Sequence, residues 1–192
     1  MKTVRNPQAA AWPADARGQA LALLFAVLED RTPLAAALRK TPGLDALSVR
    51  DRAFARLLAM TVLRRLPQLD RLIDAPMAKP LPAKQIRVRN VLRLGAAQLV
   101  FLDTPPHAAV NGAVELARAS GMDGMAGLIN AVLRKIAAGD HTAQRRMESP
   151  GENTPGWLWR SWCAAYGDAT AAAIAAAHLG EPPLDLTVMT AA

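Results

Sequence analysis

The sequence predicts an all-α protein, and three observations support this prediction. Aromatic residues make up only 4% of a chain that is 52% hydrophobic. Alanine, leucine and arginine, which favour helices, are abundant, whereas the residues that favour strands are scarce. Apolar residues recur at spacings of three and four along most segments, as on the buried face of a helix. The 192 residues are enough for one domain with a real core and a smaller second part.

The first 74 residues contain the patterns of four helices. Leu21, Leu24 and Leu28 follow the rhythm of one buried helical face. Ser48 and Asp51 have the spacing of a capping box, in which each side chain of the pair bonds the helix start. Prolines begin or interrupt the other segments, since proline fits only the first turn of a helix. The helices are expected over residues 15–30, 33–40, 48–66 and 68–74.

A long helix is expected over residues 83–102, after a proline-broken loop at 77–84. Gly95 lies at the centre of its apolar face, where a missing side chain lets another helix come close. Arg89 and Arg93 are four residues apart on the opposite face, and we expect them to project into solvent. The apolar face is formed by Val88, Val91, Leu92, Gly95, Leu99 and Leu102.

The second half continues with helices at 107–120 and 125–138, the first of them begun by a Pro-Pro pair. A polar segment rich in glycine and proline follows and is typical of a linker. Two further helices and the alternating residues Leu184, Leu186 and Val188, which indicate the start of a strand, complete the chain. The expected organisation is a flexible leader (1–14), a helical domain (15–140), a linker (141–154) and a C-terminal part (155–192).

Charge is distributed unevenly along the chain. Residues 1–146 contain 22 Lys and Arg against 11 Asp and Glu, whereas residues 147–192 contain one Arg and five acids. A basic body indicates a polyanionic partner, and arginine, which supplies 18 of the 23 basic residues, suits bidentate phosphate contacts. A compositional bias that enriches arginine and alanine everywhere is the alternative explanation.

We expect the basic residues of the separate helices to gather on one surface that contacts RNA phosphates. Such contacts make affinity strongly dependent on salt. Cations scattered over the surface would only make the protein soluble. The candidate residues are Arg17, Arg52, Arg56, Arg87, Arg89, Arg93, Arg134 and Lys135.

The sequence contains no recognisable catalytic constellation, and we predict no catalytic residue, cofactor-binding residue or metal ligand. One cysteine, Cys163, excludes an internal disulfide and a cysteine-based zinc site. Glycines at 121, 124 and 127 lack the preceding strand of a dinucleotide loop and fit a helix end followed by a helix start. We expect Asp70 and Asp74 to be solvated surface charges. The tryptophans Trp157, Trp159 and Trp162 either stack on bases or, as we prefer, pack their own helix.

Neither a secretory signal nor a membrane span is evident, so a cytoplasmic protein is the default expectation.

Three groups of segments together resemble a known family. LRLGAAQLVFLDTPPHAAVNGAVELARASG followed by GLINAVLRKI resembles the helical domain of the NusB family, as found at the front of RsmB-type (Sun/Fmu) RNA methyltransferases. ARGQALALLFAVLED and SVRDRAFARLLAMTVLRRLPQLDRLI match the same pattern near the start, and WLWRSWCAAYG with AAHLGEPPLDLTV matches after the linker. The resemblance covers about residues 15–188.

This resemblance implies a NusB-like helical bundle that binds ribosomal RNA. It further implies a parent enzyme that methylates carbon 5 of a cytosine in small-subunit ribosomal RNA, with S-adenosylmethionine as methyl donor. The catalytic motifs of such enzymes do not occur in this sequence, so this chain alone is expected to be inactive and to partner a catalytic domain beyond it. A transcription antitermination factor of the NusB type is the first alternative, and a helical protein–protein adaptor is the second.

Overall fold

The computed structural model describes residues 12–146 and 149–180, and helices are the only regular elements within these ranges. The all-α prediction is therefore confirmed for the part of the chain that the structure describes. The chain divides into two compact units, Met1–Arg146 and Met147–Ala192. The strand expected at 184–188 and residues 1–11 of the expected leader lie outside the described residues.

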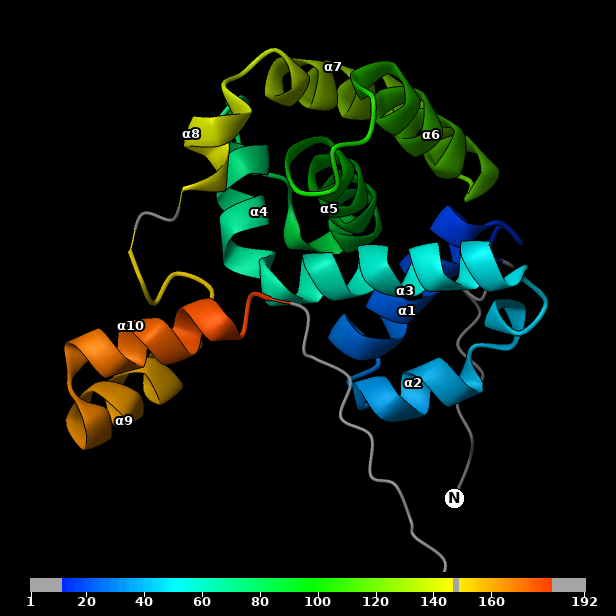
Figure 1. Ribbon diagram of the computed structural model, residues 1–192. Coiled ribbons are helices and arrows are strands. Elements are labelled where there is room, and N and C mark those ends of the chain that lie inside the picture. The colour runs from blue at the N-terminus through cyan, green and yellow to red at the C-terminus, as the bar shows by residue number, and fades with distance from the viewer. Residues whose placement is uncertain (1–11, 147–148, 181–192) are drawn as a thin grey trace, which may run out of the picture. The chain divides into compact units, whose positions relative to one another are not determined.

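The first unit is a bundle built around one central helix, α5. Figure 1 shows α5 between two layers, with α1 and α3 on one side and α6 and α7 on the other. The α4 helix packs beside α5 and completes the enclosure. The helices are α1 (Ala16–Leu28), α2 (Leu34–Lys40), α3 (Val49–Arg64), α4 (Leu66–Asp74), α5 (Ile86–Val100), α6 (Pro106–Ala119), α7 (Ala126–Ala137) and α8 (His141–Arg145).

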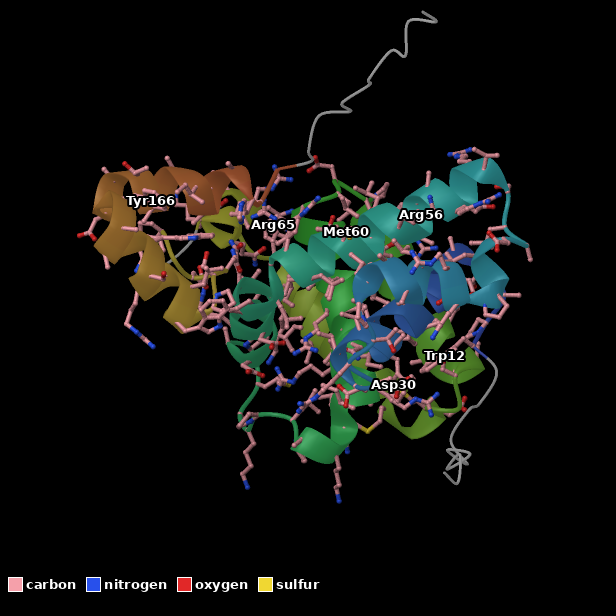
Figure 2. All side chains as sticks on the ribbon, turned by 90° about the horizontal axis from the view of Figure 1, so that it is seen from below. Trp12, Asp30, Arg56, Met60, Arg65 and Tyr166 are labelled. Carbon is pink, nitrogen blue, oxygen red and sulfur yellow. The ribbon has the colours of Figure 1, made fainter. Side chains whose placement is uncertain are left out.

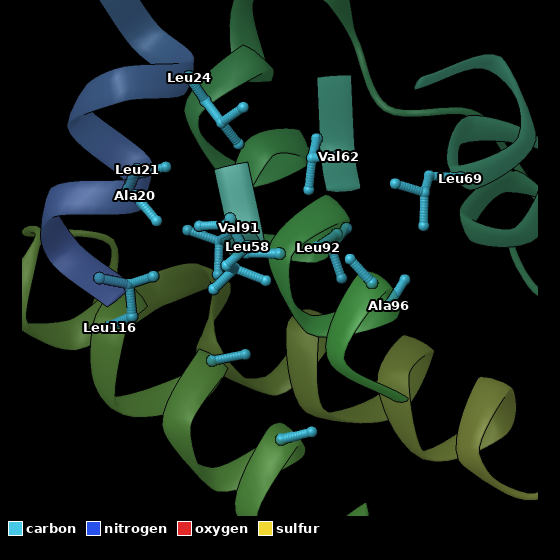
Figure 3. Packing of buried hydrophobic residues seen from close by; sticks show 14 of the residues in the cluster. Ala20, Leu21, Leu24, Leu58, Val62, Leu69, Val91, Leu92, Ala96 and Leu116 are labelled. Atoms are coloured by element: carbon cyan, nitrogen blue, oxygen red, sulfur yellow. The ribbon is translucent and has the colours of Figure 1, made fainter. Parts of the chain in front are cut away.

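The α5 helix is buried around its whole circumference over residues 90–100. In Figure 3, side chains of α1, α3 and α4 surround Val91 and Leu92 of this helix. Gly95 allows the close approach that its position predicted, because a Cβ atom there would lie 2.5 Å from Cδ1 of Leu133 in α7. Interiors are packed too tightly to accept such an overlap, so a larger residue at this position would force the buried Leu133 side chain to shift.

Local sequence signals set the helix boundaries. The Asp15 carboxylate accepts a hydrogen bond from the Gly18 amide at 2.7 Å and begins α1. At the start of α3, the Asp51 amide donates to Ser48 Oγ at 3.1 Å, and this hydroxyl donates to the Asp51 carboxylate at 2.8 Å. These bonds satisfy backbone groups that the first turn leaves unpaired. The predicted cap at Ser48 is thus confirmed.

The segment predicted as a linker, 141–154, begins with a helix that belongs to the first unit. The Asp140 side chain accepts hydrogen bonds from two amides at the start of α8. Gln68 of α4 is fully buried, and its side-chain amide donates to the carbonyl oxygen of Arg145 at 2.9 Å. This contact fastens α8 to the bundle, so the connection between the units is shorter than the predicted linker.

The second unit contains α9 (Gly156–Tyr166) and α10 (Asp168–Ala177), the two helices expected there. Gly167 joins them with φ +76°, a left-handed conformation that glycine adopts without steric cost. Trp162 packs edge-on against His178, with ring centroids 5.2 Å apart, while Trp157 is 68% exposed. Within the described residues, every helix is too short or too polar to cross a bilayer.

Candidate nucleic-acid interface

Arg93 is the most deeply buried of the predicted RNA-binding residues. Its guanidinium forms a two-pronged pair with Asp70 of α4, with nitrogen–oxygen distances of 2.8 Å and 2.7 Å, and its third nitrogen donates to Asn90 at 2.7 Å. Only 6% of the residue is exposed. The prediction that Arg93 projects into solvent is therefore wrong. It fails because α5 has no solvent face at this level, so the charge must meet a partner within the bundle.

Arg89, one turn earlier, extends the same network. Its guanidinium nitrogens lie 2.9 Å and 3.3 Å from the Asp74 carboxylate and 3.4 Å from Asp70. Burial opposes the charge of Arg89, but the hydrogen bonds and charges of the two aspartates outweigh it and raise its pKa above the ordinary value. The expected solvent exposure of Arg89 is wrong. Asp70 and Asp74 are ion-pair partners and not free surface charges.

Two further candidates, Arg87 and Arg17, make contacts within the bundle. The Arg87 guanidinium carbon lies 4.7 Å from the ring centre of Trp12, which places it over the aromatic face. Arg17 of α1 donates from Nε to the Gln98 side chain of α5 at 3.0 Å, and its guanidinium lies 5.7 Å from the ring centre of Phe54. Both arginines are half-buried, and each packs its guanidinium against an aromatic ring of the same unit.

The four remaining candidates are on the outside of the molecule, but they do not share one surface. Arg52 and Arg56 belong to α3, and Arg52 lies 3.6 Å from the Asp45 carboxylate. Arg134 and Lys135 are exposed in the last turn of α7, where the Lys135 ammonium donates to the Pro76 carbonyl at 3.2 Å. Because α3 and α7 lie on opposite sides of α5 (Figure 1), these residues form two separate groups.

A different set of arginines gathers where α3 ends and α8 packs against the bundle. Arg64 and Arg65 end α3, and Arg145 ends α8. Burial is the main cause that lowers the pKa of Arg65 below its ordinary value, and the positive charges of Arg145 and Arg64 lower it further. Within the described residues, neither Arg64 nor Arg65 forms an ion pair, and only Arg145 meets a carboxylate, that of Asp103. Positive charge therefore accumulates here without matching negative charge.

The surroundings hold these guanidinium groups in place. The Arg65 guanidinium carbon lies 4.4 Å from the ring centre of Phe101, and its Nη1 lies 3.4 Å from the Gln68 side-chain oxygen. Arg145 donates to the Val100 carbonyl at the end of α5. Each group uses part of its donor capacity for positioning, and an arginine has five N–H donors in all. The remaining donors are available for an anion.

The exposed face of α3 continues this cluster along the bundle. Figure 2 shows Arg56, Met60 and Arg65 along one helix. Arg56, Met60 and Arg64 follow each other at four-residue intervals, so they share a face, and Leu57 beside them is 40% exposed. We call this region the α3 arginine surface, defined by Arg56, Arg64, Arg65 and Arg145.

Sequence reasoning identified Arg56 of this surface and missed the other three residues. Adjacent doublets at 64–65 and 145–146 were a visible signal, since like charges side by side carry a cost that a partner anion relieves. Their proximity, however, depends on the placement of α8, which residue spacing does not reveal.

The described residues contain no group of three or more His, Cys, Asp or Glu side chains arranged to hold a metal ion. Cys163 is half-buried, and desolvation together with Asp168 raises the pKa of its thiol, which disfavours the reactive thiolate. The three glycines at 121–127 end α6, turn the chain and begin α7, as predicted.

Comparison with known proteins identifies the family of this chain. The model of the NusB family matches residues 14–138, which is most of the first unit. The chain belongs to the NusB family. The match covers the bundle from α1 to α7 and therefore includes the central helix and the α3 end of the arginine surface.

Three relatives of this NusB-family chain are named ribosomal RNA small subunit methyltransferase B. The protein of this name from Sodalis glossinidius is 38% identical over 150 residues, covering 77% of the chain and 34% of the relative. That from Shewanella oneidensis is 34% identical over 150 residues, covering 78% and 35%. That from Xylella fastidiosa is 36% identical over 161 residues, covering 82% and 35%. The chain spans about a third of the length of these relatives.

Proposed function

We propose that this chain is the RNA-binding N-terminal region of an S-adenosylmethionine-dependent 16S rRNA (cytosine-5) methyltransferase. The observation that carries the proposal is the unneutralised charge of Arg64 and Arg65 beside Arg145 in a domain of the NusB family. The names of the relatives support ribosomal RNA as the polyanion. The bundle would hold the RNA, and methyl transfer would belong to a catalytic domain of the same parent chain.

The α3 arginine surface suits the backbone of structured RNA. Guanidinium groups form two parallel hydrogen bonds to phosphate oxygens, and fixed groups lose less entropy on binding than free side chains. Arg56 and Arg64 are eight residues apart, which places them about 12 Å from each other along the helix axis. Contacts at this spacing reach more than one phosphate. Because phosphates are the same in every sequence, this surface would position RNA without selecting its sequence.

The proposal also revises the predicted contact residues. Arg17, Arg87, Arg89 and Arg93 use their guanidinium groups inside the bundle, so we assign them to stability. Arg52 flanks the α3 arginine surface, where Asp45 competes for its charge. Arg134 and Lys135 belong to the separate α7 side.

The test is a titration of fluorescently labelled hairpins from small-subunit ribosomal RNA with the chain at several salt concentrations. We expect binding at low ionic strength that weakens steeply with salt. The double variant Arg64→Gln/Arg65→Gln should lower the affinity for all hairpins by a similar factor. Arg39→Gln/Lys40→Gln is the matched control, because it removes two adjacent charges from an exposed end of α2.

Two results would contradict the proposal. One is the absence of hairpin binding at low salt, and the other is an equal loss of affinity in the α2 control. The alternative function, a NusB-type antitermination factor, also predicts RNA binding. The reading frame after the codon of residue 192 distinguishes the two functions, because a methyltransferase requires motifs there for the methyl donor and a catalytic cysteine.

A further inference from the structure

A groove lies between α6 and α7, and half of the residues that line it are polar. These two helices lie on the opposite side of α5 from α3 (Figure 1). The volume of the groove is about 460 Å³, within the range of small-molecule sites. One wall is formed by α6 residues spaced three and four apart, and the other by α7 residues with the same spacing. The polar lining residues are His107, Asn111, Asn130 and Arg134.

These four side chains have no assigned role within the fold. None of them makes a hydrogen bond or ion pair with another described residue, and each is exposed or half-buried. Val110 forms an apolar floor and is 6% exposed. Asparagines on the surface of a helix interior contribute little to helix stability, so a ligand is the better explanation for two of them facing one groove.

We propose that this groove binds one unpaired nucleotide of RNA. The imidazole of His107 offers a face for stacking on the base, and the amides of Asn111 and Asn130 each present a donor beside an acceptor. Every nucleobase edge carries such a pair, and Asn is suited to bind it with two hydrogen bonds. Arg134 supplies a guanidinium for the adjoining phosphate.

The chemistry of the lining favours RNA over a protein partner. Docking sites for proteins have apolar centres with aromatic residues, whereas four of the eight residues that line this groove are polar and none is Phe, Tyr or Trp. The inference rests on the proposed function, since the nucleotide would belong to the same ribosomal RNA. It adds a contact that reads the base, which the phosphate contacts of the α3 arginine surface do not provide.

The test uses the single-stranded hexaribonucleotides rA6, rC6, rG6 and rU6 with the full chain. We expect the wild type to prefer one base by about tenfold, as one bidentate contact to a base edge provides. Asn111→Ala/Asn130→Ala should bring the four affinities within about twofold of each other and leave the salt dependence unchanged. His107→Ala should weaken the preferred hexamer roughly tenfold through loss of stacking.

A second readout does not depend on variants. In NMR titrations with the preferred hexamer, the side-chain amide signals of Asn111 and Asn130 should shift. The amide of Gln98, which is buried and bonded to the Leu94 carbonyl, is the internal control and should not move.

The outcomes show whether the groove assignment, the proposed function or both are wrong. Equal wild-type affinities for the four hexamers, or a preference that survives Asn111→Ala/Asn130→Ala, would overturn the groove assignment and direct attention to a protein contact there. If hairpin binding nevertheless depends on Arg64 and Arg65, the proposed function stands without the groove. Failure of every RNA to bind would remove both.

Discussion

Two groups of arginines in this protein have the same chemistry and opposite surroundings. Between α4 and α5, Arg89 and Arg93 face two aspartates, and these carboxylates raise the pKa of Arg89. At the junction of α3 and α8, Arg65 faces other arginines, and burial with their charges lowers its pKa. The first group is balanced by acids within the fold, whereas Arg64 and Arg65 have no acidic partner among the described residues, and we propose that RNA phosphates supply one. The neighbours of a cation, more than its position on a helix, determine whether it stabilises the fold or binds a ligand.

The balanced group should dominate stability. Asp70→Ala leaves Arg93 buried without its carboxylate, so we expect the free energy of unfolding to fall by about 3 kcal/mol, because removing one partner strands a buried charge. Urea denaturation followed by circular dichroism measures this change. Asp45→Ala removes an exposed carboxylate 3.6 Å from Arg52 and should cost less than about 0.5 kcal/mol. Equal losses in the two variants would contradict the distinction between the groups.

The unbalanced group should dominate RNA affinity. We expect Arg64→Gln/Arg65→Gln to weaken hairpin binding by about 2 kcal/mol, or roughly 30-fold, because each lost guanidinium removes one partly screened phosphate contact. The slope of log affinity against log salt should decrease by about 1.5 to 2. Fluorescence anisotropy across salt concentrations gives both quantities. An unchanged slope would show that these residues do not contact phosphates.

A conservative exchange should distinguish geometry from charge in the balanced group. Arg93→Lys keeps the charge but loses the planar fork that reaches both oxygens of Asp70 and the Asn90 side chain. We expect a loss of about 1.5 kcal/mol in stability, measured by urea denaturation, with RNA affinity unchanged. A variant as stable as the wild type would mean that charge alone suffices at this position.

A substitution that loosens the packing of α8 should have the smallest effect on RNA affinity. Gln68→Ala removes the side chain that bonds the last carbonyls of α8, so Arg145 is less firmly held beside Arg65. We expect RNA affinity to fall about threefold, or about 0.7 kcal/mol, by fluorescence anisotropy. In Gln68→Ala/Arg145→Gln, the two losses should add to less than their sum, because the first change already loosens Arg145, which then keeps only its contacts with the Val100 carbonyl and Asp103. Fully additive effects would show that Gln68 does not act through Arg145.

The order of helices could be predicted from the sequence because apolar periods mark most of them and a capping residue or a proline marks several of their starts. Ser48, the proline breaks and Gly95 are local signals, and the structure confirms them. The surroundings of α5 could not be predicted in the same way. An arginine pair four residues apart on a helix predicts an exposed face, unless a second helix packs against it with two acids at the same spacing. Asp70 and Asp74 have that spacing, and matching the two pairs would have predicted the network.

The arginine surface required tertiary information. Arg64 and Arg145 are far apart in sequence, and several tertiary contacts, among them the buried amide of Gln68 and the bond from Arg145 to the Val100 carbonyl, bring α8 to the end of α3. Whether any of the eight predicted residues contacts RNA stays a prediction. Arg56, Arg134 and Lys135 are the exposed residues among them and are the ones most accessible to RNA.

The enclosure of α5 on all sides has a practical consequence for studying this protein. Backbone amides at the heart of a bundle exchange their hydrogens with solvent only when the whole domain opens, whereas those at helix ends exchange through local fraying. The hydrogen-exchange rates of residues 90–100 therefore report the opening of the whole domain and serve as its internal reference. RNA that binds the folded bundle should slow the exchange of this helix by the amount of the global stabilisation, and protection of the locally fraying amides elsewhere would mark the bound surface without any mutation.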